Sequence, residues 1–336
     1  MPESFFHNPK SEPSVEADTV FRANYLVPGA PNYREQAKVY SRRLDIIEYD
    51  SLMLVGVLDA DEPGWHLNEH DSSPRSVRHR AVEAAFVAWL GRTNGNERVL
   101  IIDRAAEEFT DRGLAISARA NNRQIASLAK SQSVECLSGD VRGTELAHIM
   151  KRAGASSLEI SLLWSISALP SFALSKTRPE YLGAFLAHQA GLAGVEGFSS
   201  PSDPEYHEFD TAGWSARELQ QTDANVASKL IPRWNNFLGR ELFVVEPSGI
   251  DLAGIDIENS TELAGRLMPL CSVNSTGPLS VLAQQMAGAQ DLYLFRIITE
   301  RILRGQHPFV IFGTSHIVSI KPALDALYGD GIRKAG

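Results

Sequence analysis

The sequence has little cysteine and no long apolar run. Two of its 336 residues are cysteines, Cys136 and Cys271, too few for a disulfide framework or a cysteine-based zinc site. The most apolar stretch, 158–174, contains Glu159 and falls short of the roughly 20 residues that a membrane-spanning helix needs. The polar N-terminus lacks the apolar segment of a signal peptide. We therefore expect a cytoplasmic protein without a membrane segment.

Positive charge and the common catalytic motifs are also scarce. Lys and Arg total 32 against 41 Asp and Glu, which gives a net charge of −9. Binding to nucleic-acid phosphates requires clustered Lys and Arg, so no nucleic-acid partner is expected. The sequence contains no Gly-x-Ser-x-Gly, P-loop, Gly-x-Gly-x-x-Gly or His-Glu-x-x-His motif. Their absence excludes the commonest forms of serine hydrolase, NTPase, dinucleotide-binding enzyme and zinc protease.

Strand and helix patterns alternate over residues 50 to 154. Apolar strand patterns at 52–57, 99–102 and 134–137 are followed by helical patterns that start near 73, 113 and 144. This alternation predicts a parallel sheet with right-handed crossovers.

From 155 to 305 the pattern becomes helical, and a last strand and helix at 308–328 return to the same sheet. The expected helices are 178–193, 214–238 and 277–304, with one short strand at 241–245. The sequence thus predicts an α/β fold: a mostly parallel sheet with flanking helices and a helical insertion or cap over its carboxyl edge. The expected divisions are a mobile N-terminal arm (1–17), a first α/β half (18–154), the mainly helical insertion (155–305) and a closing strand and helix (306–336).

The closing stretch, 307–316, is the first candidate for a site. Phe309 to Phe312 form an apolar run typical of a strand buried on both faces. Gly313 allows a sharp turn, His316 follows it, and a helix is expected from 318, with Pro322 in its first turn. Ligands bind outside the carboxyl ends of parallel strands, so His316 is expected at such a site.

Two other strand ends carry acidic residues. Asp59 lies three residues after Gly56, as His316 lies three residues after Gly313, and Asp103 directly follows the strand 99–102. Parallel strands would bring these groups to one edge, where a carboxylate and an imidazole can bind a divalent metal ion or share a proton. Asp103 could instead cap a helix or pair with a neighbouring arginine.

His66 and Arg296 complete the candidates. His66 and His70 lie four residues apart in an acidic, turn-like segment, which is either a metal-binding or a solvated loop. Arg296 has apolar neighbours on both sides in sequence. It is therefore either part of a structural salt bridge or a residue that recognises a substrate carboxylate or phosphate.

The two ends of the chain resemble the TraB/Tiki and erythromycin-esterase-like superfamily, which also includes ChaN-type haem-binding lipoproteins. In that superfamily a helix with an arginine precedes a strand that ends in Gly-x-x-His, as Arg296 precedes Gly313-Thr314-Ser315-His316 here. The superfamily also opens with a strand and a Gly-x-x-His or Gly-Glu-x-His motif, then a helix and a strand ending in an acidic residue. The segment 52–56, the helix expected from Ser76 and the segment 99–103 follow this order, and the middle of the chain carries no resemblance.

The opening motif departs from the superfamily: Asp59 stands in place of histidine, and Val57 in place of the glutamate of the esterase-like branch. The resemblance implies a hydrolase of small-molecule or peptide substrates, in which Asp59, Asp103 and His316 act as acid, base or ligands. Arg296 would bind negative charge. A divalent metal ion would be held by Asp59, His316 and His66. The alternative is a non-catalytic ligand-binding or interaction protein on the same scaffold, and homo-oligomer formation stays open.

Overall fold

The computed structural model describes residues 15–25, 45–57, 72–102, 120–141, 143–174, 181–198, 215–247, 249–273, 275–329 and 331–335. Within these ranges the main sheet has six strands in the order β4-β3-β7-β2-β1-β8. They are β1 (Asp45–Tyr49), β2 (Leu52–Val57), β3 (Arg98–Ile102), β4 (Glu135–Ser138), β7 (His307–Gly313) and β8 (Ile332–Ala335).

The four strands β4, β3, β7 and β2 are parallel, and their carboxyl ends share one edge. Val57 pairs with Gly313, and Ile102 pairs with both Ile311 and Ser138. The predicted α/β fold with a mostly parallel sheet is therefore confirmed. The sequence patterns did not predict β1 or β8, each of which is antiparallel to its neighbour and extends the sheet beyond β2.

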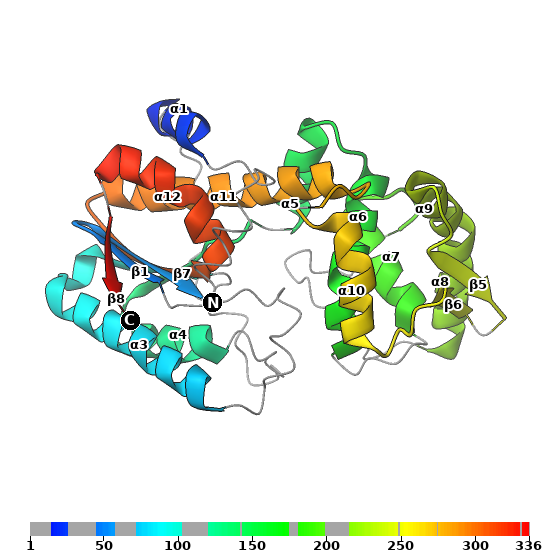
Figure 1. Cartoon of the computed structure of the whole chain (residues 1–336), viewed down its shortest axis with the longest axis horizontal. Helices are drawn as coiled ribbons and strands as arrows, with labels where there is room; N and C mark the ends of the chain where they lie inside the picture. The colour runs from blue at the N-terminus through cyan, green and yellow to red at the C-terminus, as the bar shows by residue number, and fades with distance from the viewer. Residues whose placement is uncertain are drawn as a thin grey trace, which may run out of the picture.

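Helices cover both faces of this sheet (Figure 1). One face carries α3 (Ser72–Arg92) and α4 (Ala120–Ser131). A short 3₁₀ turn, Gly95–Glu97, connects the end of α3 to β3. The other face carries α11 (Ser280–Leu303) and α12 (Thr314–Tyr328), with α1 (Val15–Asn24) packed over them.

The central strand β7 explains why its sequence is apolar without alternation. Phe309 and Ile311 pack with α3 and α4, whereas Val310 and Phe312 pack on the side of α11 and α12. All four side chains are almost fully buried, as a strand covered on both faces requires.

The rest of the chain forms a helical part beside the sheet part. It contains α5 (Gly143–Arg152), α6 (Ser157–Leu174), α7 (Leu182–Leu192), α8 (Ala216–Lys229), α9 (Ile231–Leu238), α10 (Ser260–Cys271) and the hairpin of β5 (Phe243–Glu246) and β6 (Gly249–Leu252). These elements enclose their own apolar core. Helix α11 joins the two parts, because Leu282 and Ala283 belong to this core while Phe295 and Ile298 pack on the sheet. The parallel strands point toward the helical part (Figure 1).

The observed helices differ from the sequence prediction in three ways. The helix expected over 214–238 is two helices, because Pro232 has no N–H with which to continue α8 and instead occupies the first turn of α9. Helices α1, α6 and α10 were not predicted. Helix α12 begins at Thr314 rather than at 318, so Pro322 lies inside it, and His316 belongs to its first turn.

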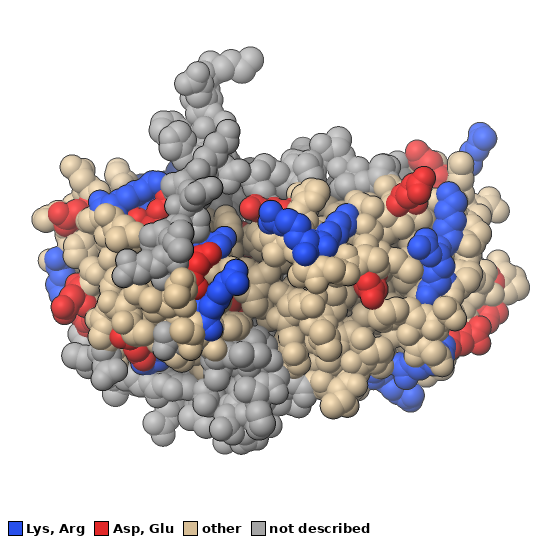
Figure 2. All heavy atoms as spheres, turned by 90° about the horizontal axis from the view of Figure 1, so that it is seen from above, with Lys and Arg blue, Asp and Glu red and all other residues tan. Residues whose placement is uncertain are grey.

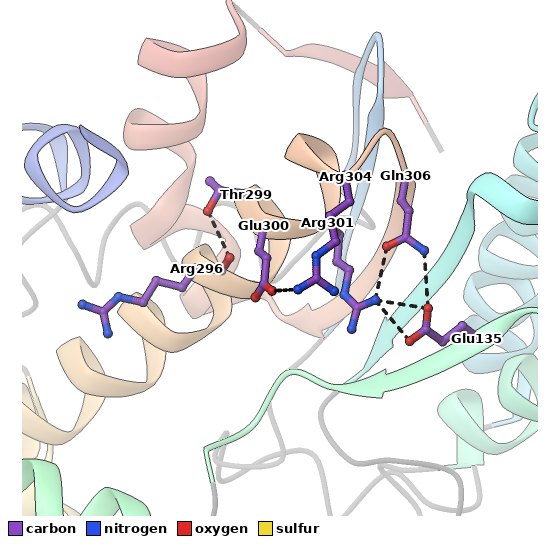
Figure 3. A network of polar contacts seen from close by, with 7 residues as sticks. All are labelled: Glu135, Arg296, Thr299, Glu300, Arg301, Arg304 and Gln306. Carbon is purple, nitrogen blue, oxygen red and sulfur yellow. Dashed lines mark hydrogen bonds and ion pairs between the residues drawn. The ribbon is translucent and has the colours of Figure 1, made fainter. Parts of the chain in front are cut away.

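A network of polar contacts lies where the parallel strands β4 and β7 begin (Figure 3). The nearly buried guanidinium of Arg301 contacts the Glu135 carboxylate at 3.2 Å and the Gln306 side chain at 3.2 Å. Gln306 also donates to Glu135 at 3.4 Å. The network thereby ties the end of α11 to the start of β4.

On the face seen from above, basic and acidic side chains are scattered among uncharged residues (Figure 2). None of the described helices is both long enough and apolar enough to cross a membrane.

Candidate functional site

His316 stands at the carboxyl edge of the sheet, in the first turn of α12 and directly after the central strand. Gly56 on the neighbouring strand β2 lets α12 begin this close. A Cβ atom at Gly56 would lie 3.1 Å from Thr314 Oγ1. The glycine that the sequence pattern singled out in β2 therefore makes room for the helix that carries His316.

A buried carboxylate holds the His316 imidazole. His316 Nδ1 lies 2.5 Å from Oδ1 of Asp291, which comes from α11. Asp291 is fully buried, whereas the His316 side chain is 21% exposed. The carboxylate thus lies inside the protein, and the ring reaches from it to the surface at the sheet edge.

Asp291 has a second hydrogen-bond donor from the start of the chain. Tyr25 Oη donates to Asp291 Oδ2 at 2.5 Å, across a sequence separation of 266 residues. Each carboxylate oxygen of Asp291 therefore has its own partner, as a buried carboxylate requires. Tyr25, Asp291 and His316 form one chain of hydrogen bonds that runs from the residue after α1 through α11 to α12.

Apolar packing fixes the other side of the imidazole. The Phe312 ring meets the His316 ring edge to face, with a centroid distance of 5.1 Å. Gly139, after β4, leaves space for Phe312, because a Cβ atom there would lie 2.6 Å from Phe312 Cε2. The strand ends β2, β4 and β7 thus all shape the surroundings of His316.

This arrangement determines which nitrogen of His316 can act. A carboxylate at Nδ1 favours the tautomer with the proton on Nδ1 and stabilises the imidazolium form. Nε2 is then the atom that can exchange a proton with a substrate or bind a metal ion.

Arg296 forms a salt bridge in the structure, and its predicted role in binding a substrate's charge stays a prediction. Its Nε donates to Asp18 Oδ1 at 2.9 Å, and its Nη2 contacts Asp18 Oδ2 in a bidentate pair. Figure 3 shows the Arg296 guanidinium pointing toward α1 and away from the Glu135 network. Arg296 therefore anchors α1 to α11.

The remaining predicted site residues, Asp59, Asp103 and His66, lie outside the described residues, as does His70. Their convergence with His316 stays a prediction. Among the residues that the structure does describe, no group of three or more potential ligands from His, Cys, Asp and Glu could hold a metal ion. His316 alone does not define a metal site.

The sequence reasoning missed Asp291 and Tyr25. Asp291 had a usable signal: it is an acidic residue within a helix that is apolar on most sides, and a buried carboxylate needs a partner. Tyr25 had none, because nothing local to 15–25 points to a residue of α11.

Cys136 does not have the properties of a nucleophile. Burial, together with the nearby Glu135 carboxylate, raises the pKa of the Cys136 thiol to about 11. The thiol therefore stays protonated at neutral pH, and a thiolate is the form that reacts.

Fold and site together define an α/β protein with a histidine–aspartate pair at the carboxyl edge of a mostly parallel sheet. No family model, no curated protein and no solved structure matches the chain.

Proposed function

We propose that the protein is a hydrolase of small-molecule or peptide substrates in which His316 is the general acid–base. The observation that carries this proposal is the 2.5 Å contact between His316 Nδ1 and the fully buried Asp291. Such a carboxylate orients the imidazole and compensates its charge when Nε2 takes a proton from water or from a nucleophile.

The location of the pair supports the same function. Ligands of open α/β sheets bind at the carboxyl ends of the strands, and His316 directly follows the central strand there. The first turn of α12 also brings the positive end of a helix dipole to this edge. A second histidine–carboxylate contact, His307 with Glu97 at 3.8 Å, lies at the opposite end of β7 and lacks this location.

The resemblance to the TraB/Tiki and erythromycin-esterase-like superfamily is consistent with this function. It also suggests that the site binds a divalent metal ion. In the proposed scheme Asp59 and His66 would join His316 Nε2 around a divalent ion. Asp291 would then orient the ligand histidine from behind, as carboxylates commonly do at zinc sites. The acid–base role of His316 does not depend on this ion.

The first test is a hydrolysis screen. The wild-type protein is assayed against panels of carboxylic esters, phosphate esters and peptides, each with a chelator and with added Zn²⁺, Mn²⁺ or Mg²⁺. Against the best substrate, His316→Ala is expected to lower kcat/KM by about 10²- to 10⁴-fold, the usual contribution of a general acid–base. Asp291→Asn is expected to cause a loss of similar size, because it favours the wrong tautomer.

The matched control is His307→Ala, which removes a histidine from the amino end of the same strand and should leave the rate unchanged. The proposal fails if the wild-type protein hydrolyses no member of the panels, or if His316→Ala hydrolyses as fast as the wild type. Metal analysis of the purified wild-type and His316→Ala proteins tests the metal separately, since loss of a ligand lowers the bound metal content.

A further inference from the structure

We infer that Tyr25 is a positioning residue for His316, and that α1 is therefore part of the working site. This inference rests on the proposed function of His316 and extends it to the first described segment of the chain. The carboxylate of Asp291 contacts both Tyr25 and His316 and so connects them.

Asp291 needs both of its donors. Its carboxylate is 0% exposed, so water cannot replace a lost partner, and an unpaired buried charge is strongly destabilising. With Tyr25 on Oδ2 and His316 on Oδ1, the plane of the carboxylate is fixed at both oxygens. Hydrogen bonds to a charged acceptor are short and strong, which suits this role.

Contacts that do not involve Asp291 hold α1, and with it Tyr25, in place. The Phe21 ring stacks on the Tyr25 ring at 4.5 Å and packs against Phe295 of α11 at 5.0 Å. Asp18, one helical turn before Phe21 in α1, pairs with Arg296 of α11. Helix α1 is thus docked by an aromatic cluster and an ion pair, and its end delivers the tyrosine hydroxyl to Asp291.

Loss of the hydroxyl has a defined consequence. Without a donor on Oδ2 the carboxylate can rotate, and its geometry toward His316 Nδ1 is no longer fixed. The imidazole then loses part of its preference for the Nδ1–H tautomer, which presents Nε2 as the base. The hydroxyl of Tyr25 never needs to touch a substrate for this effect.

The test uses Tyr25→Phe, which keeps the ring that stacks on Phe21. The matched control is Tyr49→Phe, because Tyr49 Oη donates to Asp325 at 2.8 Å near the other end of α12. Ring ¹⁵N and low-field ¹H NMR signals of His316 report the tautomer and the Nδ1–H bond directly. We expect Tyr25→Phe to weaken the low-field signal and mix the tautomers, and Tyr49→Phe to leave both as in the wild type.

If a substrate has been found, kcat of Tyr25→Phe should fall about ten- to hundredfold, the equivalent of one hydrogen bond to a charged group, with KM unchanged. The inference is overturned if His316 signals in Tyr25→Phe match the wild type, or if Tyr49→Phe changes them as much. The NMR result does not need activity. A protein without hydrolysis but with the expected NMR change would refute the proposed function and leave Tyr25 as the residue that positions His316.

Discussion

The sheet part and the helical part handle buried charge differently. Both charged residues that are buried among the described ones, Asp291 and Arg301, belong to the portion of α11 that packs on the sheet. Each is paired with a group far away in sequence, Tyr25 and Glu135 respectively. In the helical part, by contrast, none of the described Asp, Glu, Lys and Arg residues is buried to this degree, and Asp223 is only partly buried.

This difference indicates that the relative placement of the elements is more tightly constrained in the sheet part. Long-range polar pairs require that several elements be placed together correctly, and such placement is what a catalytic group needs. The helical part relies mainly on apolar packing, such as the contact of Trp234 with Phe243 at 5.4 Å. We therefore expect perturbations of the two parts to have separate consequences.

The largest effects should come from the two cores. Trp234→Ala in the helical part and Phe309→Ala in β7 each remove a fully buried aromatic side chain. Each should lower the free energy of unfolding by about 3–5 kcal/mol. Because Trp234 packs in the core of the helical part and Phe309 in the core between the sheet and the helices α3 and α4, hydrogen exchange in Trp234→Ala should accelerate mainly in α6 to α10, and in Phe309→Ala mainly in the sheet. Equal acceleration of both parts by either variant would show that they unfold as one unit.

The sequence predicted those features of the fold that depend on residues close together in the chain. The apolar runs of β2, β3 and β7 and their shared carboxyl edge follow from patterns a few residues long. The position of His316 at that edge follows from them too. The pairings of β1 and β8 did not follow, because the place of an edge strand depends on partners far away along the chain.

The same reasoning explains which part of the site was missed. Glycine followed by histidine after an apolar run is a local pattern, so His316 could be found. Its partner Asp291 lies 25 residues earlier and Tyr25 lies 266 residues before Asp291. Only the packing of α1, α11 and α12 against one another brings these three side chains together.

A smaller effect is expected from Asp223, and it depends on pH. Desolvation raises the pKa of the Asp223 carboxyl above its ordinary value of 3.8, and its Oδ1 would lie 1.8 Å from a Cβ atom at Gly183. The folded state therefore holds this proton more firmly than the unfolded state does. The resulting stabilisation is fully present below pH 3.8 and is lost as the pH rises through the raised pKa. Asp223→Asn should thus gain stability relative to the wild type between pH 4 and 7.

Glu218 on the same helix gives a control of opposite sign. Hydrogen bonds from Ser215 lower the pKa of the Glu218 carboxyl, so its contribution is present at neutral pH and is lost on acidification. Urea denaturation of Asp223→Asn, Glu218→Gln and the wild type at several pH values measures both. A stability difference between Asp223→Asn and the wild type that does not change with pH would show that burial does not destabilise the Asp223 carboxylate.

The smallest effect concerns two serines of α6, both 0% exposed. Ser161 Oγ donates to the Leu158 carbonyl at 2.7 Å, whereas Ser165 Oγ has no hydrogen-bond partner. Replacement by alanine raises helix propensity equally at both positions, so the difference between the two variants isolates the hydroxyl. Ser165→Ala should be more stable than Ser161→Ala by about 0.5–1.5 kcal/mol, the net value of one hydrogen bond. Equal denaturation midpoints would mean that the Ser165 hydroxyl is satisfied in solution.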